Sequence, residues 1–163
     1  MNEKTSRTLS SDSDHPQLIL PPPLIFLGYL ISAIVLERIV PFPTPWPLPL
    51  RFLGGVLVIA GVLLVGSAFS ELVKAHTTPD PRQPSTALVI TGPYRFIRNP
   101  IYLGFLLIYL GFTLLAATLW GLLLSPFLVG TVTRWIIHAE EAYLGRKFKE
   151  EYQAYYSRVR PWV

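Results

Sequence analysis

The polar side chains best placed to do chemistry lie between residues 91 and 104, where TGPYRFIRNPIYLG separates two long apolar segments. Arg95 and Arg98 are three residues apart, so their side chains share a face if this stretch is helical. Arginines at a membrane edge commonly act as positive-inside anchors. The pair can also belong to a binding loop at the membrane surface, and both interpretations stay open at this point.

Two breaks within the same stretch indicate how its side chains are held. Gly92-Pro93 is a turn signal. Asn99-Pro100 predicts the start of a helix, with Asn99 at the N-cap and Pro100 in the first turn. Tyr102 then lies at the beginning of an uncharged run. The loop therefore delivers polar and aromatic side chains to the mouth of an apolar helix.

A second group of candidates follows the last apolar run, where Arg134 precedes Glu140 and Glu141. An arginine at the end of a span is often a snorkelling anchor, and it can equally bind a substrate carboxylate or phosphate. A pair of glutamates after a span is usually a solvated helix face. Because neighbouring residues on a helix point about 100° apart, we expect the two carboxylates to have different partners.

Neither a metal site nor a nucleic-acid surface is indicated. The chain has no Cys, which excludes disulfides, thiolate metal sites and a Cys nucleophile. His76 and Asp80 lack a set of further ligands, so they do not predict a metal site. The net charge of +4 fits basic residues placed on one side of a membrane, and no stretch interleaves basic and aromatic residues.

The elements that must position these residues are membrane helices. Hydrophobic residues make up 51% of the chain and charged residues only 15%, which predicts an all-α, polytopic membrane protein. Residues 101–133 carry no charge, and one helix of that length would measure about 50 Å, whereas the apolar core of a bilayer is about 30 Å thick. We therefore expect a reversal near residues 117–120. One domain at 18–163 would follow a disordered tail at 1–17, with four spans at about 23–40, 52–70, 101–117 and 120–137.

The remaining segments follow from their composition. Residues 41–49 alternate proline with other residues, which predicts an extended loop. Residues 139–157 are amphipathic and predict a C-terminal helix outside the membrane. Two glycine pairs with seven-residue spacing, Gly54 with Gly61 and Gly104 with Gly111, predict close packing between helices.

The distribution of basic residues predicts the orientation. With four spans, twelve Lys and Arg residues fall on the side of the termini and only Arg38 and Arg51 on the other. Cytoplasmic loops carry the excess of Lys and Arg. We therefore expect a multi-pass protein of a prokaryotic inner (plasma) membrane, with both candidate groups facing the cytoplasm.

Two blocks of the sequence resemble the isoprenylcysteine carboxyl methyltransferase and phospholipid N-methyltransferase family of integral membrane enzymes. The resemblance covers residues 74–162 and rests on two separated motifs in the family's order. Asn99 stands where the family commonly has His, and Lys149 where it often has Gly. The first motif comprises Leu88, Val89, Gly92, Pro93, Tyr94, Arg98, Asn99, Pro100, Tyr102 and Gly104, and the second Glu140, Glu141, Leu144, Phe148, Glu151, Tyr152 and Tyr155.

The resemblance implies S-adenosylmethionine as the methyl donor and assigns roles to residues of both motifs. Glu140 would accept hydrogen bonds from ribose hydroxyls or balance the cofactor's charge, and Glu141 would pair with an arginine. Arg98 would bind a carboxylate, either that of the cofactor or Glu141. Arg98 and Arg134 are the candidates for acting on substrate. The implied cofactor-binding residues are Leu88, Val89, Tyr94, Arg98, Asn99, Pro100, Tyr102, Gly104, Glu140 and Glu141.

The substrate implied by the resemblance is a lipid or a prenylated, isoprenylcysteine-like carboxylate that enters from the bilayer. A phospholipid carrying an ethanolamine amine is the alternative acceptor. A sterol reductase that uses NADPH shares a similar C-terminal pattern but needs additional spans. A non-enzymatic membrane protein would bind no cofactor at all. The sequence indicates no nucleic-acid partner and no particular oligomeric state.

Overall fold

The computed structural model describes residues 21–42, 46–78 and 83–162, and all regular elements in these ranges are helical. Among the described residues, three helices are long and apolar enough to cross a membrane: α1 (Pro22–Ile39), α2 (Leu48–Lys74) and the continuous helix Leu119–Tyr156, which begins with α4 (Leu119–Val132). A shorter apolar helix, α3 (Pro100–Leu115), lies between α2 and α4 in the sequence. A π turn, η2 (Thr133–Ile137), joins α4 directly to α5 (His138–Tyr156), and a short 3₁₀ helix, η1 (Gly92–Arg95), precedes α3. The prediction of an all-α, polytopic membrane protein is confirmed. Residues 1–17, predicted to be a disordered tail, lie outside the described ranges.

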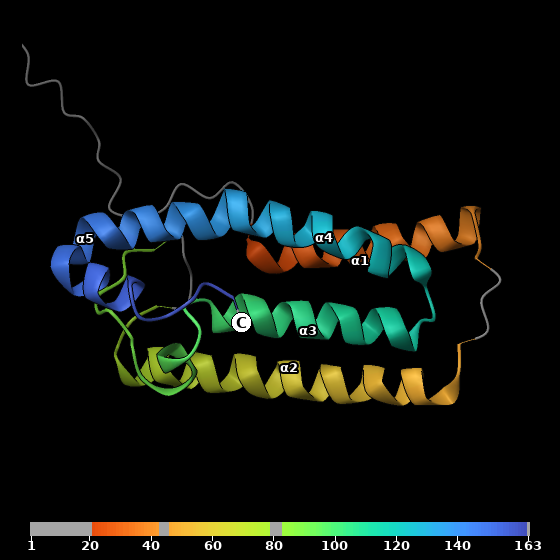
Figure 1. The fold of residues 1–163 in the computed structure, drawn as a ribbon, viewed down its shortest axis with the longest axis horizontal. Coiled ribbons are helices and arrows are strands. Elements are labelled where there is room, and N and C mark those ends of the chain that lie inside the picture. Colours follow the sequence, from red (N-terminus) through yellow and green to blue (C-terminus); the bar gives the residue numbers. More distant parts are fainter. Residues whose placement is uncertain (1–20, 43–45, 79–82, 163) are drawn as a thin grey trace, which may run out of the picture.

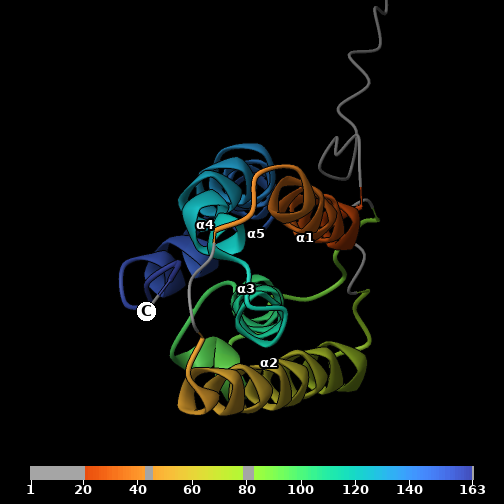
Figure 2. The ribbon, with the colours of Figure 1, turned by 90° about the vertical axis from the view of Figure 1, so that its right-hand side faces the viewer.

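The bundle is organised around α3, which has α2 on one side and α1 and α4 on the other (Figures 1 and 2). The glycine pairs explain the tight packing of α2 against α3. A Cβ atom added to Gly54 would lie 2.8 Å from the carbonyl oxygen of Gly111, and one added to Gly61 would lie 2.6 Å from that of Gly104. The two backbones can approach this closely only because neither helix has a side chain at these points.

The uncharged stretch of 33 residues does fold back on itself, as predicted. α3 ends at Leu115, Ala117 adopts a left-handed backbone conformation with φ of 55°, and α4 begins at Leu119. Thr118 fixes the reversal, because its backbone N–H donates to Thr113 O and its hydroxyl donates to Glu37 Oε2 at 2.9 Å. Glu37 Oε1 also accepts from the Phe42 backbone N–H. One carboxylate therefore joins the end of α1 to both connections at this end of the bundle.

One local prediction was wrong. Leu48 and Pro49 are helical rather than part of the proline loop, because a proline is tolerated in the first turn of a helix. Arg95 and Arg98 do not share a face, since η1 ends at Arg95, whose side chain is exposed, whereas only 6% of the Arg98 side chain is exposed. The helix predicted at 139–157 is present as α5, which η2 joins to α4 without a break, but Lys149 interrupts it with a non-helical backbone (φ 44°, ψ −115°).

The loops around α3 bring both sequence motifs to the same end of the bundle (Figure 1). η1 is anchored on the last turn of α2, where the Glu71 carboxylate accepts hydrogen bonds from Thr91 and Lys74. The chain turns back within α5, at Lys149 (Figure 1), and residues 158–162, here called the return segment, run beside the residues that precede α3. Ile97 and Arg160 form an isolated parallel β-bridge.

Candidate functional site

A cavity of about 410 Å³ lies where η1, the start of α3, the last turns of α2 and α5 meet. Nine of the residues proposed from the sequence line it: Leu88, Val89, Tyr94, Arg98, Asn99, Pro100, Tyr102, Glu140 and Glu141. They come from segments about 40 residues apart in the chain. The tertiary fold thus brings both motifs to a single cavity.

The carboxylate of Glu140 lies at the wall of this cavity and accepts a hydrogen bond from the Tyr102 hydroxyl at 2.8 Å. The last apolar span ends at Ile137, so Glu140 belongs to the polar helix α5 that follows it. Burial disfavours the charged form and raises the pKa of Glu140 to about 7, the Tyr102 hydrogen bond opposes that rise, and the neighbouring Glu141 adds to it. Glu140 is therefore a carboxyl group that can change its charge near neutral pH.

Glu141 faces a different partner, as expected for adjacent residues on a helix. Its Oε1 atom lies 3.0 Å from Arg98 Nη2, and only 6% of the Arg98 side chain and 15% of the Glu141 side chain are exposed. The Tyr156 ring lies under the guanidinium, 3.7 Å from its central carbon. Glu141 Oε1 accepts no hydrogen bond and Arg98 Nε donates none, so the ion pair is a contact between charges and is not aligned as a hydrogen bond. The Arg98–Glu141 pair is therefore a buried charge pair in the cavity wall.

Tyrosines of α5 complete the wall, and the sequence did not identify them as site residues. Tyr155 donates from its hydroxyl to the Tyr94 carbonyl at 2.7 Å, and Tyr143 accepts from the Ser85 backbone N–H at 3.0 Å. Burial raises the pKa of Tyr155 to about 12 and also raises the pKa of Tyr94, so both hydroxyls stay neutral. Tyr143, Tyr152 and Tyr155 are the buried residues of α5, but the non-helical Lys149 lies between Tyr143 and the other two, so helical spacing alone could not place all three on one face.

The other side of the cavity is apolar. It is lined by Pro21–Pro23 at the start of α1, by Val65 and Phe69 of α2, and by Phe105 of α3. α1 and α2 are separated by α3 and do not pack against each other (Figure 2). No pattern in the sequence distinguishes these residues from side chains that only face lipid.

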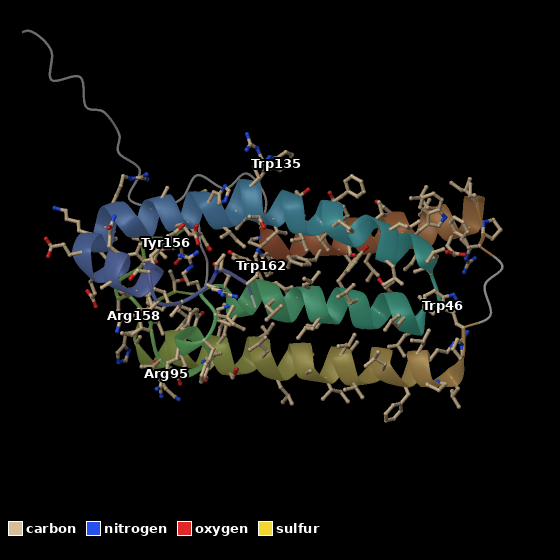
Figure 3. The ribbon with its side chains drawn as sticks, viewed as in Figure 1. Trp46, Arg95, Trp135, Tyr156, Arg158 and Trp162 are labelled. Carbon is tan, nitrogen blue, oxygen red and sulfur yellow. The ribbon has the colours of Figure 1, made fainter. Side chains whose placement is uncertain are left out.

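Two residues proposed from the sequence are not among those that line the cavity. Gly104 packs against the backbone of α2, where an added Cβ would lie 3.0 Å from Gly61 O. Arg134 is exposed on η2, beside Trp135, whose exposed fraction is 67% (Figure 3). Among the residues that the structure describes, no group of three or more His, Cys, Asp or Glu could hold a metal ion.

Asn99 occupies the N-cap position of α3, as predicted, but its side chain does not cap the helix. Its Nδ2 atom instead donates to the carbonyl oxygen of Pro161 at 3.2 Å. Asn99 therefore lines the cavity and at the same time holds the return segment.

Comparisons with known proteins agree with this arrangement. Residues 50–151 match the family model described as phospholipid methyltransferase. The chain is also similar to the Protein-S-isoprenylcysteine O-methyltransferase of Schizosaccharomyces pombe, with 30% identity over 107 residues, which are 66% of this chain and 43% of that protein. The match thus spans less than half of the relative's length. No solved structure matches the chain.

Proposed function

Because the chain belongs to the phospholipid methyltransferase family, we propose that it is an integral membrane methyltransferase that uses S-adenosylmethionine to methylate a lipid-borne acceptor. The observation that carries this proposal is a single cavity with two unlike sides. One side presents Glu140, Glu141 and Arg98, and the other presents the apolar residues of α1 and α2. A polar cofactor and a lipid substrate can meet in such a cavity.

The polar side fits the chemical groups of the cofactor. The Arg98 guanidinium can bind the carboxylate of the methionine moiety, and the Glu141 carboxylate can accept from its ammonium group. Glu140 can accept hydrogen bonds from ribose hydroxyls, and ionised it can balance the positive sulfur. The rings of Tyr94 and Tyr102 offer faces to adenine or to the sulfonium.

S-adenosylmethionine, when bound, supplies a methyl group whose carbon is attached to a positively charged sulfur, and that sulfur is a good leaving group. The protein must then align donor and acceptor and exclude water, since the reaction is a direct displacement at carbon. The residues that surround the cavity serve these two tasks. Arg98, Glu140 and Glu141 orient one reactant, and Val65, Phe69 and Phe105 keep water from the other.

For the acceptor we propose a lipid or prenylated carboxylate, as the name of the S. pombe relative suggests. A carboxylate is already a nucleophile and needs no base. A phospholipid amine is the second candidate. Its ammonium group must lose a proton before it can attack, and Glu140, whose pKa is raised to about 7, is a base that can accept that proton. The charge distribution of the loops supports a cytoplasmic location for the site.

The test begins with calorimetric titration of S-adenosylhomocysteine into the detergent-solubilised protein. Radiolabelled methyl transfer is then measured on a farnesylated cysteine derivative and on phosphatidylethanolamine. A methyl ester releases labelled methanol in base, whereas a methylated amine does not, so one base treatment separates the two acceptors. Absence of S-adenosylhomocysteine binding, or copurification of NADPH in its place, would overturn the proposed function.

A further inference from the structure

The return segment connects two parts of the site that are far apart in the sequence. Arg98 donates its backbone N–H to Arg160 O at 2.9 Å, and Asn99 Nδ2 donates to Pro161 O. Trp162 then donates its indole N–H to Thr133 Oγ1 at 3.2 Å. The segment thus links the wall that begins α3 to the π turn from which α5 emerges.

Arg98 and Asn99 line the cavity, but their partners in these bonds do not. Neither Thr133 nor any residue of the return segment lines the cavity. The direct links across the cavity, from Tyr102 to Glu140 and from Arg98 to Glu141, use groups that a bound ligand would contact. When a ligand competes for those groups, the bonds of the return segment can still hold the two walls in place.

Thr133 is the point at which the return segment meets the turn that leads into α5. It is the first residue of η2, and the direction of α5, with Glu140 and Glu141 on it, depends on how this turn is wound. π turns inside α-helices occur frequently at functional sites. Trp162 is also packed against the buried core cluster that includes Tyr102 and Ile136, so its indole ring has a fixed position from which to donate.

We infer that Trp162 is a positioning residue of the cofactor site, which acts through Thr133 to set the spacing between the Arg98–Asn99 wall and the Glu140–Glu141 wall. The inference rests on the proposed function, because it concerns the affinity of the same cavity for S-adenosylhomocysteine. It adds a residue that does not contact the ligand and that belongs to neither sequence motif.

The experiment compares S-adenosylhomocysteine affinity in single variants of the full chain. Trp162→Phe keeps an aromatic ring in the core but removes the donor, and Thr133→Val keeps the side-chain shape but removes the acceptor. Each should weaken binding by about three- to tenfold, the range expected when one net hydrogen bond is lost. The double variant should bind no more weakly than either single variant, because both remove the same bond. Thr133→Ser keeps the hydroxyl and should bind as wild type does.

Two matched controls separate positioning from general stability. Thr131→Val removes the hydrogen bond between Thr131 Oγ1 and the Tyr29 hydroxyl, two residues before Thr133, and should lower the thermal midpoint without changing affinity. Trp135→Phe alters the exposed tryptophan of the same π turn and should change neither. All affinities are measured well below the thermal midpoint of each variant.

The outcomes distinguish the two proposals. If the wild-type protein does not bind S-adenosylhomocysteine, the proposed function fails, and this inference fails with it. If wild type binds and Thr133→Val binds equally well, only the positioning role is overturned. Equal weakening in Thr131→Val would also overturn it, because the effect would then be one of stability. Should Trp162→Phe not fold, Thr133→Val with its Thr133→Ser rescue decides the question.

Discussion

Replacement of Glu140 by Gln tests the centre of the proposed site. The substitution keeps the size of the side chain and its ability to accept a hydrogen bond from Tyr102, whose hydroxyl lies 2.8 Å from Glu140 Oε1. It removes the charge and replaces one acceptor oxygen by a donor. The variant therefore probes electrostatic recognition of the ligand with little disturbance of packing.

The expected loss of affinity follows from the type of hydrogen bond. Bonds that involve a charged group contribute about 1.5–3 kcal/mol, so Glu140→Gln should bind S-adenosylhomocysteine roughly ten- to a hundredfold more weakly than wild type. The loss should depend on pH. The pKa of Glu140 is raised to about 7, so wild-type affinity should increase between pH 6 and pH 8 as the carboxylate ionises, and Glu140→Gln should lack that increase.

The assay is calorimetric titration in detergent at several pH values, preceded by a thermal melt of each variant. Glu150→Gln is the matched control, because Glu150 is exposed on the same helix and does not line the cavity. It should bind as wild type does at every pH. If Glu140→Gln shows wild-type affinity at pH 8, Glu140 does not contact the ligand, and the assignment of the cofactor to this wall is refuted.

Three further predictions concern stability and topology. A Glu whose pKa is raised on folding stabilises the protein below its unfolded pKa, and this contribution is lost as pH rises through about 7. The thermal midpoint of ligand-free Glu140→Gln should therefore rise relative to that of wild type between pH 6 and pH 8. A difference in midpoint that does not change with pH would contradict the burial argument. Gly61→Ala should destabilise the bundle by about 1–3 kcal/mol in reversible unfolding, because the added Cβ would meet the α3 backbone. Gly66→Ala should be tolerated, because a Cβ added there has no atom within 4 Å. Equal effects of the two substitutions would argue against the close packing. Cysteines introduced at Arg51 and Ser157 of this Cys-free chain should react with impermeant maleimide from opposite sides of sealed vesicles, and labelling from the same side would refute the topology.

The membrane fold could be predicted from the sequence because its main constraint is one-dimensional. An uncharged run is either short enough to cross the bilayer once or must turn, and the run from residue 101 to residue 133 is too long for a single crossing. Glycines seven residues apart stay on one helix face whatever the partner helix is. Gly54, Gly61, Gly104 and Gly111 could therefore be assigned to helix packing before their partners were known.

The direction of individual side chains could not be predicted in the same way. A π turn widens the helix locally, so regular helical spacing does not carry across residues 133–137. Arg134 precedes the two glutamates by a few residues, yet it lies on the exposed surface whereas they line the cavity. The sequence contains no signal for that turn, so it could not show that Arg134 faces away from the cavity.

The partners of the site residues were decided by tertiary structure alone. Asn99 has the sequence context of a helix cap, but its side chain donates to Pro161, which is 62 residues away. Pro21–Pro23 and Phe69 line the cavity only because α3 lies between α1 and α2. Local composition determines which segments enter the membrane and which residue types can do chemistry. The side chains that meet are determined by how helices distant in sequence pack, and that depends on long-range contacts which no local pattern encodes.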